Sequence, residues 1–326
     1  MNLRNKILLA IFALGTIVGC DSLIYDDLKD CPQGVYVSFY SKTPCAEDST
    51  YPVVESLKVF AFDKNGILAA EQEVQNPKLS KDYEMLIPLK EGDYTFIAWT
   101  GINAERYTVA KTEIGKTTLN EVLFEIKEVN KIANATPTPG FKIYMGTSEK
   151  VSLPAANEFG SVFEHTQINI LEQTNRIQVS LVGIKNPERY DILVFSANGS
   201  MNFDGHITRN KEQLNYPGEV DATSTPKTLI SKFNTLKLQT GYHNKLVVYD
   251  KHEKKNIFYA DLIGSILLSK GDDHDTNIDL SCTHDFNIKL YVKDVCDCET
   301  YEFIACEVNL IKWDLHSYNI DLGDNF

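Results

Sequence analysis

The chain has 326 residues and a formal net charge of −13 at pH 7, so it is long enough for two domains and strongly acidic. Binding to nucleic acid needs clustered Lys and Arg beside the phosphates, and the few basic runs here are short and mixed with acidic residues. We therefore expect no nucleic-acid partner.

The first twenty residues have the pattern of a secretion signal. Arg4 and Lys6 precede a short apolar run that stops at Gly19-Cys20, which has the form of a lipobox. A membrane-spanning helix is the alternative, but such a helix needs about 20 apolar residues. We predict that residues 1–19 are removed, which leaves a mature charge near −15, and that Cys20 carries acyl chains that hold the protein to a membrane.

Residues 20–33 follow as an acidic tether without periodicity. Beyond it, apolar and polar residues alternate in short runs rich in β-branched and aromatic side chains, a pattern that predicts strands. The first block of strands is expected at residues 35–39, 57–62, 83–89 and 94–99. The second of these strands runs into Asp63-Lys64-Asn65-Gly66, a sequence typical of a hairpin turn.

A Pro-containing stretch over residues 136–157 is interpreted as the segment that separates the first domain from a second block of strands. That block is expected at residues 176–181, 192–195, 246–249, 286–292 and 308–313. Helical periodicity is limited to residues 118–127 and 261–268, and both also fit strands or single turns. The pattern predicts an all-β protein of two tandem sandwiches, with domains at residues 34–165 and 166–326.

Six cysteines follow Cys20 in a chain that is exported, so disulfides are the default interpretation. They are Cys31, Cys45, Cys282, Cys296, Cys298 and Cys306. Six cysteines allow 15 pairings, and sequence proximity favours Cys31 with Cys45 and the other four among themselves. Zinc is the alternative at Cys296 and Cys298, but zinc sites usually separate paired cysteines by two to four residues.

Motifs for other chemistry are incomplete. Residues 110–117 are close to a P-loop, but Ala110 replaces its first glycine, and a hairpin with Gly115 at the turn explains them better. Residues 273–279 begin like a calcium loop, but Ile278 occupies the glycine position. Paired carboxylates of a glycosidase have no positive support. We expect no catalytic residues, no metal and no cofactor.

Several short motifs occur in a fixed order along the mature chain. They cover residues 20–22, 25–28, 30–32, 89–94, 98–101, 246–250, 311–313 and 315–316. With these motifs and its lipobox, the chain resembles the FimB-type anchor family of type V fimbriae. The resemblance spans nearly the whole mature chain.

The resemblance implies two transthyretin-like β-sandwich domains after a lipoprotein signal peptide, on the surface of the outer membrane of a Gram-negative cell. It implies an anchor subunit that attaches the base of the pilus, ends subunit addition and has fimbrillin subunits as partners. The alternative is a surface lipoprotein that binds glycans or host ligands. That alternative predicts an exposed cluster of Trp and Tyr, because sugar rings stack on aromatic side chains.

In such fimbriae, a strand from one subunit completes the open sheet of the next. The resemblance therefore makes residues 312–326 the candidate partner strand, whose apolar side chains are Trp313, Leu315, Ile320 and Leu322. The spacing between Leu315 and Ile320 breaks strict alternation. The alternative is that residues 308–315 form the last strand of the second sandwich.

Overall fold

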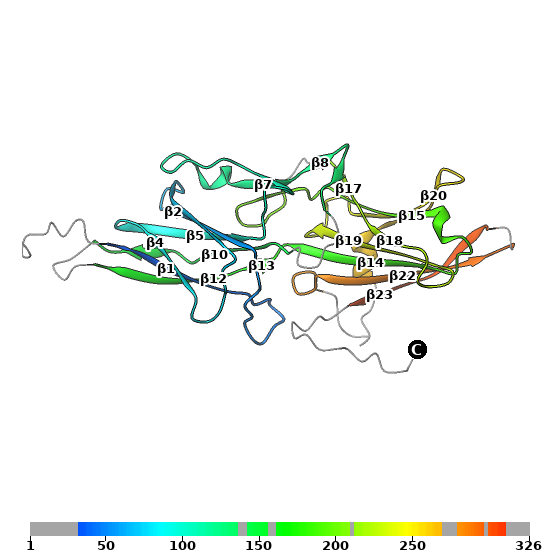
Figure 1. The fold of residues 1–326 in the computed structure, drawn as a ribbon, viewed down its shortest axis with the longest axis horizontal. Coiled ribbons are helices and arrows are strands. Elements are labelled where there is room, and N and C mark those ends of the chain that lie inside the picture. The colour runs from blue at the N-terminus through cyan, green and yellow to red at the C-terminus, as the bar shows by residue number, and fades with distance from the viewer. Residues whose placement is uncertain are drawn as a thin grey trace, which may run out of the picture.

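The computed structural model describes residues 32–135, 142–155, 161–208, 212–268, 279–296 and 299–310. Strands form most of these residues, and Figure 1 shows them in two groups along one axis. We call the group that contains β1 the first sandwich and the group that contains β14 the second sandwich. The helices within the described ranges are short: η2 (Leu119–Glu121), η3 (Pro187–Arg189) and α2 (Leu262–Leu268).

The first sandwich consists of a three-stranded and a six-stranded sheet. The smaller sheet has the order β12 (Phe163–Asn169), β1 (Gly34–Tyr40) and β4 (Glu84–Pro88). The larger sheet has the order β13 (Leu171–Glu172), β10 (Tyr144–Thr147), β5 (Gly92–Thr100), β2 (Ser56–Asp63) and β3 (Leu68–Gln75), with β11 (Val151–Leu153) also paired to β5.

Alternation along β1 explains the packing of the two sheets. Val35, Val37 and Phe39 are buried and pack in one cluster with residues of β5 such as Phe96. The opposite face of the larger sheet is also buried, because Trp99 packs against Phe124 with ring centroids 5.7 Å apart. The central strands β2 and β5 are therefore covered on both faces, which matches their nearly continuous apolar sequences.

The second sandwich consists of a five-stranded and a six-stranded sheet. One sheet has the order β18 (Glu219–Asp221), β19 (Thr228–Leu236), β14 (Thr174–Val182), β22 (Asp285–Asp294) and β23 (Tyr301–Leu310). The other has the order β21 (Lys255–Asp261), β20 (Lys245–Asp250), β15 (Tyr190–Ser196), β17 (Leu214–Tyr216), β9 (Ile132–Ala133) and β8 (Glu128–Val129).

Residues 107–135 connect the two sandwiches although they come from the first half of the chain. β7 (Leu123–Ile126) pairs with β6 (Tyr107–Val109) on one side and with β16 (Ser200–Asn202) on the other. β9 pairs with β17 of the second sandwich. One buried apolar cluster runs from Phe60 in β2 to Leu290 in β22, so the sandwiches share a continuous core.

The prediction of an all-β protein with two sandwiches is confirmed. The hairpin turn at Asp63–Gly66 is also confirmed: the Asp63 carboxylate accepts hydrogen bonds from the amides of Asn65 and Ile67, and Gly66 has a φ of 72°. Of the two ambiguous segments, residues 118–127 form η2 and β7, whereas residues 262–268 form helix α2.

Two strand expectations need correction. Residues 136–157 were expected to separate the two domains, but their described part forms β10 and β11, which pair with β5 inside the first sandwich. The last strand starts at Tyr301, earlier than the expected residue 308, because it forms a long hairpin with β22. The expected domain boundary between residues 165 and 166 falls inside β12, which pairs with β1 over its whole length.

Candidate functional site

Most of the side chains that the sequence singles out for lipidation, for disulfides or for pairing with a partner subunit lie outside the described residues. These are Cys20, Cys31, Cys298, Trp313, Leu315, Ile320 and Leu322. Cys45, Cys282, Cys296 and Cys306 lie within them. The candidate site that the structure defines is the junction of the two sandwiches, together with the hairpin that leads toward the C-terminal segment.

Cys45 and Cys282 form a disulfide across this junction, with Cα atoms 5.8 Å apart. The expectations that Cys45 pairs with Cys31 and that Cys282 pairs with one of the other three C-terminal cysteines are therefore wrong. Sequence proximity misleads here because the loop after β1 and the loop before β22 meet at the junction, although they are far apart in the chain. Cys296 is also disulfide-bonded, so it is not a thiolate ligand, and the alternative zinc interpretation of this residue is wrong.

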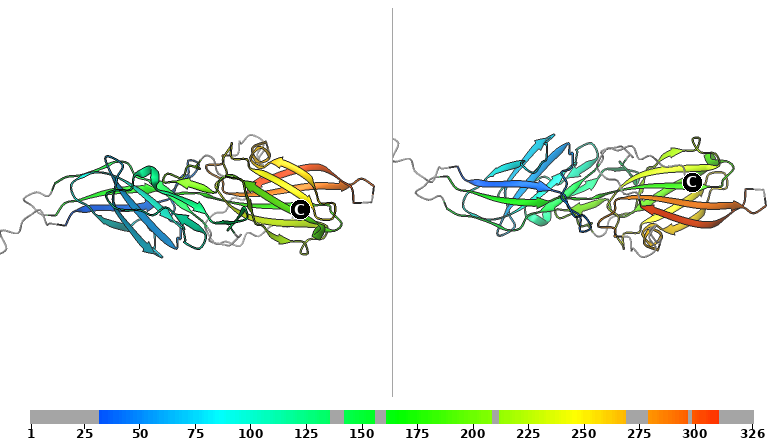
Figure 2. Two further views of the ribbon diagram at one scale, coloured as in Figure 1. Left: turned by 90° about the horizontal axis from the view of Figure 1, so that it is seen from above. Right: turned by 90° about the horizontal axis from the view of Figure 1, so that it is seen from below.

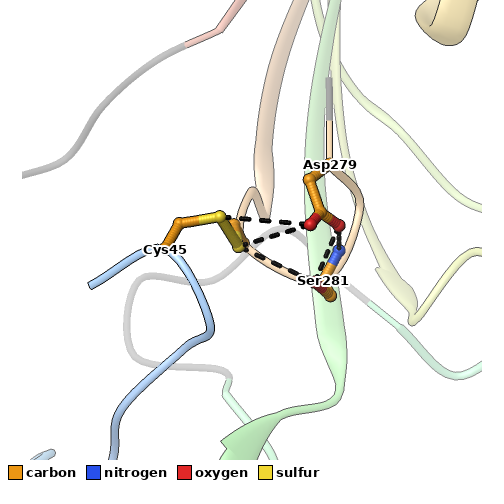
Figure 3. The surroundings of a disulfide bond; sticks show 4 residues. Cys45, Asp279 and Ser281 are labelled. Atoms are coloured by element: carbon orange, nitrogen blue, oxygen red, sulfur yellow. Dashed lines mark hydrogen bonds between the residues drawn. A yellow bond between two sulfur atoms is a disulfide. The ribbon is translucent and has the colours of Figure 1, made fainter. Parts of the chain in front are cut away.

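A tight turn holds the Cys282 end of the bridge (Figure 3). The Asp279 carboxylate accepts hydrogen bonds from the Ser281 amide at 2.8 Å and the Ser281 hydroxyl at 2.7 Å. The amides of Cys282 and Thr283 donate to the Asp279 carbonyl at 3.0 and 3.1 Å. These bonds fix the backbone on both sides of the sulfur, as expected for an Asx-type turn.

The Asp279 carboxylate lies beside both sulfurs, 4.0 Å from Sγ of Cys45 and 3.7 Å from Sγ of Cys282. Two cysteines and a carboxylate are possible metal ligands, but both sulfurs are already bonded to each other. Hydrogen bonds from Ser281 hold the pKa of Asp279 below its ordinary value. The disulfide therefore lies beside a negatively charged carboxylate at neutral pH.

The Cys45 end of the bridge is held by β12. The side chain of Asn169 accepts a hydrogen bond from the Lys42 amide and donates one to the Lys42 carbonyl, both at 2.9 Å. Ser41 and Thr50 exchange two backbone hydrogen bonds of 2.8 Å, which close the loop around Cys45. The loop is thus fastened to the first sandwich on both sides of the cysteine.

A group of charged side chains lies next to the bridge. Arg176 at the start of β14 donates to Asp285 of β22 at 2.5 and 2.7 Å and also forms an ion pair with Glu172 of β13. Burial raises the pKa of Glu172, but the nearby basic groups, Arg176 foremost among them with Lys142 and His284, together lower it by more, so the pKa lies below its ordinary value. The guanidinium joins one strand of the first sandwich to two of the second.

His284 and Lys237 lie close to the same group and are partly withdrawn from water. Burial lowers the pKa of His284 and that of Lys237, so neutral His284 is favoured at pH 7. The amide of Arg176 donates to the His284 carbonyl at 2.7 Å, which continues the pairing of β14 and β22 up to the disulfide turn. The sequence alone does not indicate this charge cluster, because Arg176 stands at the polar start of an alternating strand pattern.

β22 and β23 form a hairpin that extends to the end of the molecule opposite the start of β1 (Figure 2). β22 is an inner strand between β14 and β23, whereas β23 is the edge strand in the described sheet order. An edge strand presents backbone groups that can pair with another chain. The last described residue, Leu310, lies opposite Phe286, so the hairpin returns the chain to the region of Cys282.

The remaining motifs do not form the sites they resemble. Residues 110–117 are a turn between β6 and η2, where Gly115 has a φ of 80°, and no α-helix follows that could complete a P-loop. Of the calcium-like segment, only Asp279 lies within the described residues, and it supports the disulfide turn. Within the described ranges, no helix has the length and apolar content to cross a bilayer.

Together, these features define an extended β protein of two sandwiches joined by a disulfide, with an edge strand near its C-terminus, which is the architecture that the resemblance to fimbrial anchors implied. The family model for fimbrillin-A associated anchor proteins Mfa1 and Mfa2 matches residues 28–319. The chain belongs to this family of fimbrial anchor proteins, which confirms the resemblance drawn from the sequence motifs.

Individual relatives agree with this assignment. The chain is 40% identical to the minor fimbrium anchoring subunit Mfa2 of Porphyromonas gingivalis, over 99% of this chain and 98% of the relative. The solved structure of the fimbrial anchor protein Mfa2 from Porphyromonas gingivalis has a TM-score of 0.76 at 38% identity, covering 88% of this chain and all of the other.

A structure from Bacteroides thetaiotaomicron, described as a candidate polysaccharide-binding protein, has a TM-score of 0.69 at 19% identity. It covers 84% of this chain and 95% of the other. This match shows a shared fold.

Proposed function

We propose that this protein attaches the base of a fimbria to the outer membrane through acyl chains on Cys20, and that it ends the addition of subunits. The observation that carries the proposal is the 40% identity to a minor fimbrium anchoring subunit over 99% of this chain. A match of that extent spans the lipobox as well as both sandwiches. The proposed partners are fimbrillin subunits.

The lipid explains both parts of the proposed role. Each buried methylene of an acyl chain contributes about 0.8 kcal/mol, so several chains on one residue hold a protein at a membrane without a spanning helix. An N-terminus that remains in the membrane cannot enter a further subunit. The chain would therefore accept subunits on one side only, and assembly would stop there.

Attachment to the next subunit is proposed to use the C-terminal segment, including Trp313, Leu315, Ile320 and Leu322. Support comes from β23, the edge strand that leads into this segment. A strand that pairs with a neighbouring sheet gains affinity from main-chain hydrogen bonds and specificity from alternate side chains. The glycan-binding alternative has no comparable support, since the exposed aromatic residues in the described part of the chain are Tyr51 and Tyr259, on different sandwiches.

Replacement of the lipidated residue tests the proposal. In cells that express Cys20→Ala, a tagged fatty acid should no longer label the protein, and fimbriae should move from the cell fraction to the medium. Ser22→Ala is the matched control, because it changes the adjacent tether and leaves the lipobox intact. Continued labelling of Cys20→Ala, or unchanged retention of fimbriae after labelling is lost, would reject lipid anchoring.

A further inference from the structure

The disulfide of the junction shortens the covalent path through the molecule. Cys45 and Cys282 are 237 positions apart in the sequence. Cys45 follows β1, the first described strand, and Cys282 precedes the β22–β23 hairpin, the last two strands. A path of covalent bonds therefore runs from the first strand to the final hairpin without passing through residues 46–281.

Both ends of the bridge are fastened to rigid strands. On one side, Asn169 at the end of β12 bonds both backbone groups of Lys42. On the other side, the Asp279 turn continues into β22, which Arg176 holds through Asp285. The bond therefore connects the frameworks of the two sandwiches, and a force on one framework reaches the other directly.

We propose that the Cys45–Cys282 disulfide carries mechanical tension between the two ends of the chain and keeps residues 46–281 folded when the ends are pulled apart. The role of this disulfide in the cell rests on the proposed function, in which lipid holds the N-terminus and a fimbria holds the C-terminal segment. The backbone between Cys45 and Cys282 lies off the covalent path that joins those points, so a force between them can extend this backbone fully only if the disulfide breaks.

Under such a pull, β23 should be the first part of the second sandwich to unfold. Leu310 lies opposite Phe286 at the open end of the β22–β23 hairpin, so a pull on the C-terminal side separates the hairpin one pair at a time. β1 resists differently, because it is paired along its length with β12 on one side and β4 on the other. Extension should therefore begin in β23 and leave the first sandwich folded.

Single-molecule stretching of the purified mature chain tests whether the Cys45–Cys282 disulfide carries the tension. The protein carries a peptide tag at each terminus and is pulled between two handles attached to these tags. Oxidised wild type is compared with the double variant Cys45→Ser and Cys282→Ser. At about 3.3–3.6 Å per extended residue, residues 46–281 add roughly 800 Å to the final length. The variant should reach this extra length, and oxidised wild type should stop short of it.

The first release in oxidised wild type should come from the segment between Cys282 and Leu310, which is on the order of 100 Å when extended. Cys306→Ser is the matched control, because it removes a cysteine outside this bridge, and its final length should equal that of wild type. Wild type reduced after folding, with the open bridge verified by mass spectrometry, should gain the same roughly 800 Å as the double variant.

Release of the full chain length by oxidised wild type would overturn the proposal, whether or not the double variant folds. Equal final lengths for oxidised and reduced wild type would overturn it as well. The handles replace both the membrane and the fimbria, so this result does not depend on anchoring. Loss of fimbrial attachment in cells is measured separately with Cys20→Ala, and the two proposals can fail independently.

Discussion

The side chain of Asn169 pairs with the backbone of Lys42 as a neighbouring strand would, since it bonds both the amide and the carbonyl at 2.9 Å. Asn169 is the last residue of β12, and Lys42 is three positions before Cys45. This contact brings the loop after β1 to the junction, where its cysteine can meet the loop before β22. A side chain from a third segment of the chain thus holds the loop that carries Cys45.

Asn169→Ala should loosen this loop while both sandwiches remain folded. Two hydrogen bonds are lost, and each contributes about 0.5–1.5 kcal/mol, so the expected cost is about 1–3 kcal/mol. The Lys42 amide should exchange with deuterium faster in the variant. Asn65→Ala in the exposed β2–β3 turn is the control and should leave that exchange unchanged; an unaltered rate at Lys42 in Asn169→Ala would contradict the role of this side chain.

The Asp279 charge should slow the reduction of the bridge. A thiolate must approach the sulfurs past a carboxylate 3.7–4.0 Å away, and two unit charges at about 4 Å repel by about 1 kcal/mol in water. Asp279→Asn should therefore be reduced several-fold faster by a small thiol at neutral pH, as followed by mass spectrometry.

Two controls test whether the charge of Asp279 causes the difference in reduction rate between wild type and Asp279→Asn. The rate difference should shrink at high salt, because exposed charges are screened. A neutral phosphine should reduce wild type and variant at similar rates, because it has no charge for the carboxylate to repel. Equal acceleration with thiol and phosphine would instead indicate a loosened turn.

Acid should weaken the Glu172–Arg176 ion pair in a defined pH range. The pKa of Glu172 is lowered in the folded protein, so its contribution to stability is fully present above the ordinary value of 4.5 and is lost as the pH falls through the lowered value. Glu172→Gln should reduce the free energy of unfolding by about 1–3 kcal/mol at pH 7.

Melting temperatures from pH 7 to pH 3 check this assignment. The difference between wild type and Glu172→Gln should stay constant from pH 7 to about 5 and shrink below the ordinary pKa. Glu47→Gln, an exposed carboxyl in the loop around Cys45, is the control and should follow wild type. A difference that remains undiminished at pH 3 would mean that packing, rather than charge, accounts for the loss.

Deletion of residues 317–326 should separate attachment from folding. The segment lies beyond the apolar run of residues 308–313, so the melting temperature of the truncated protein should stay close to that of wild type. Fimbrillin should shift from cells to the medium if the segment pairs with the next subunit. Unchanged retention would remove the partner-strand role, and a large fall in melting temperature would make the segment part of the second sandwich.

Local sequence was sufficient to predict many of the strands and one turn. Alternation in Val35-Tyr36-Val37-Ser38-Phe39 corresponds to β1, and Asp63–Gly66 forms the predicted turn, because side-chain periodicity and turn chemistry act over a few residues. The family motifs likewise identified the family from short segments in order. Lipidation of Cys20 stays a prediction, and so does the participation of Cys31 in a disulfide, although its partner is not Cys45.

The partners of these strands and cysteines were decided by tertiary structure. Residues 128–133 join a sheet of the second sandwich, and Cys45 bonds to Cys282, because non-local packing brings those segments together. Loop closure becomes only slowly more costly with loop length, so proximity in sequence is a weak guide to pairing once a folded core holds two loops together. Periodicity determines which face of a strand is buried, but the shared core determines which strand lies beside it.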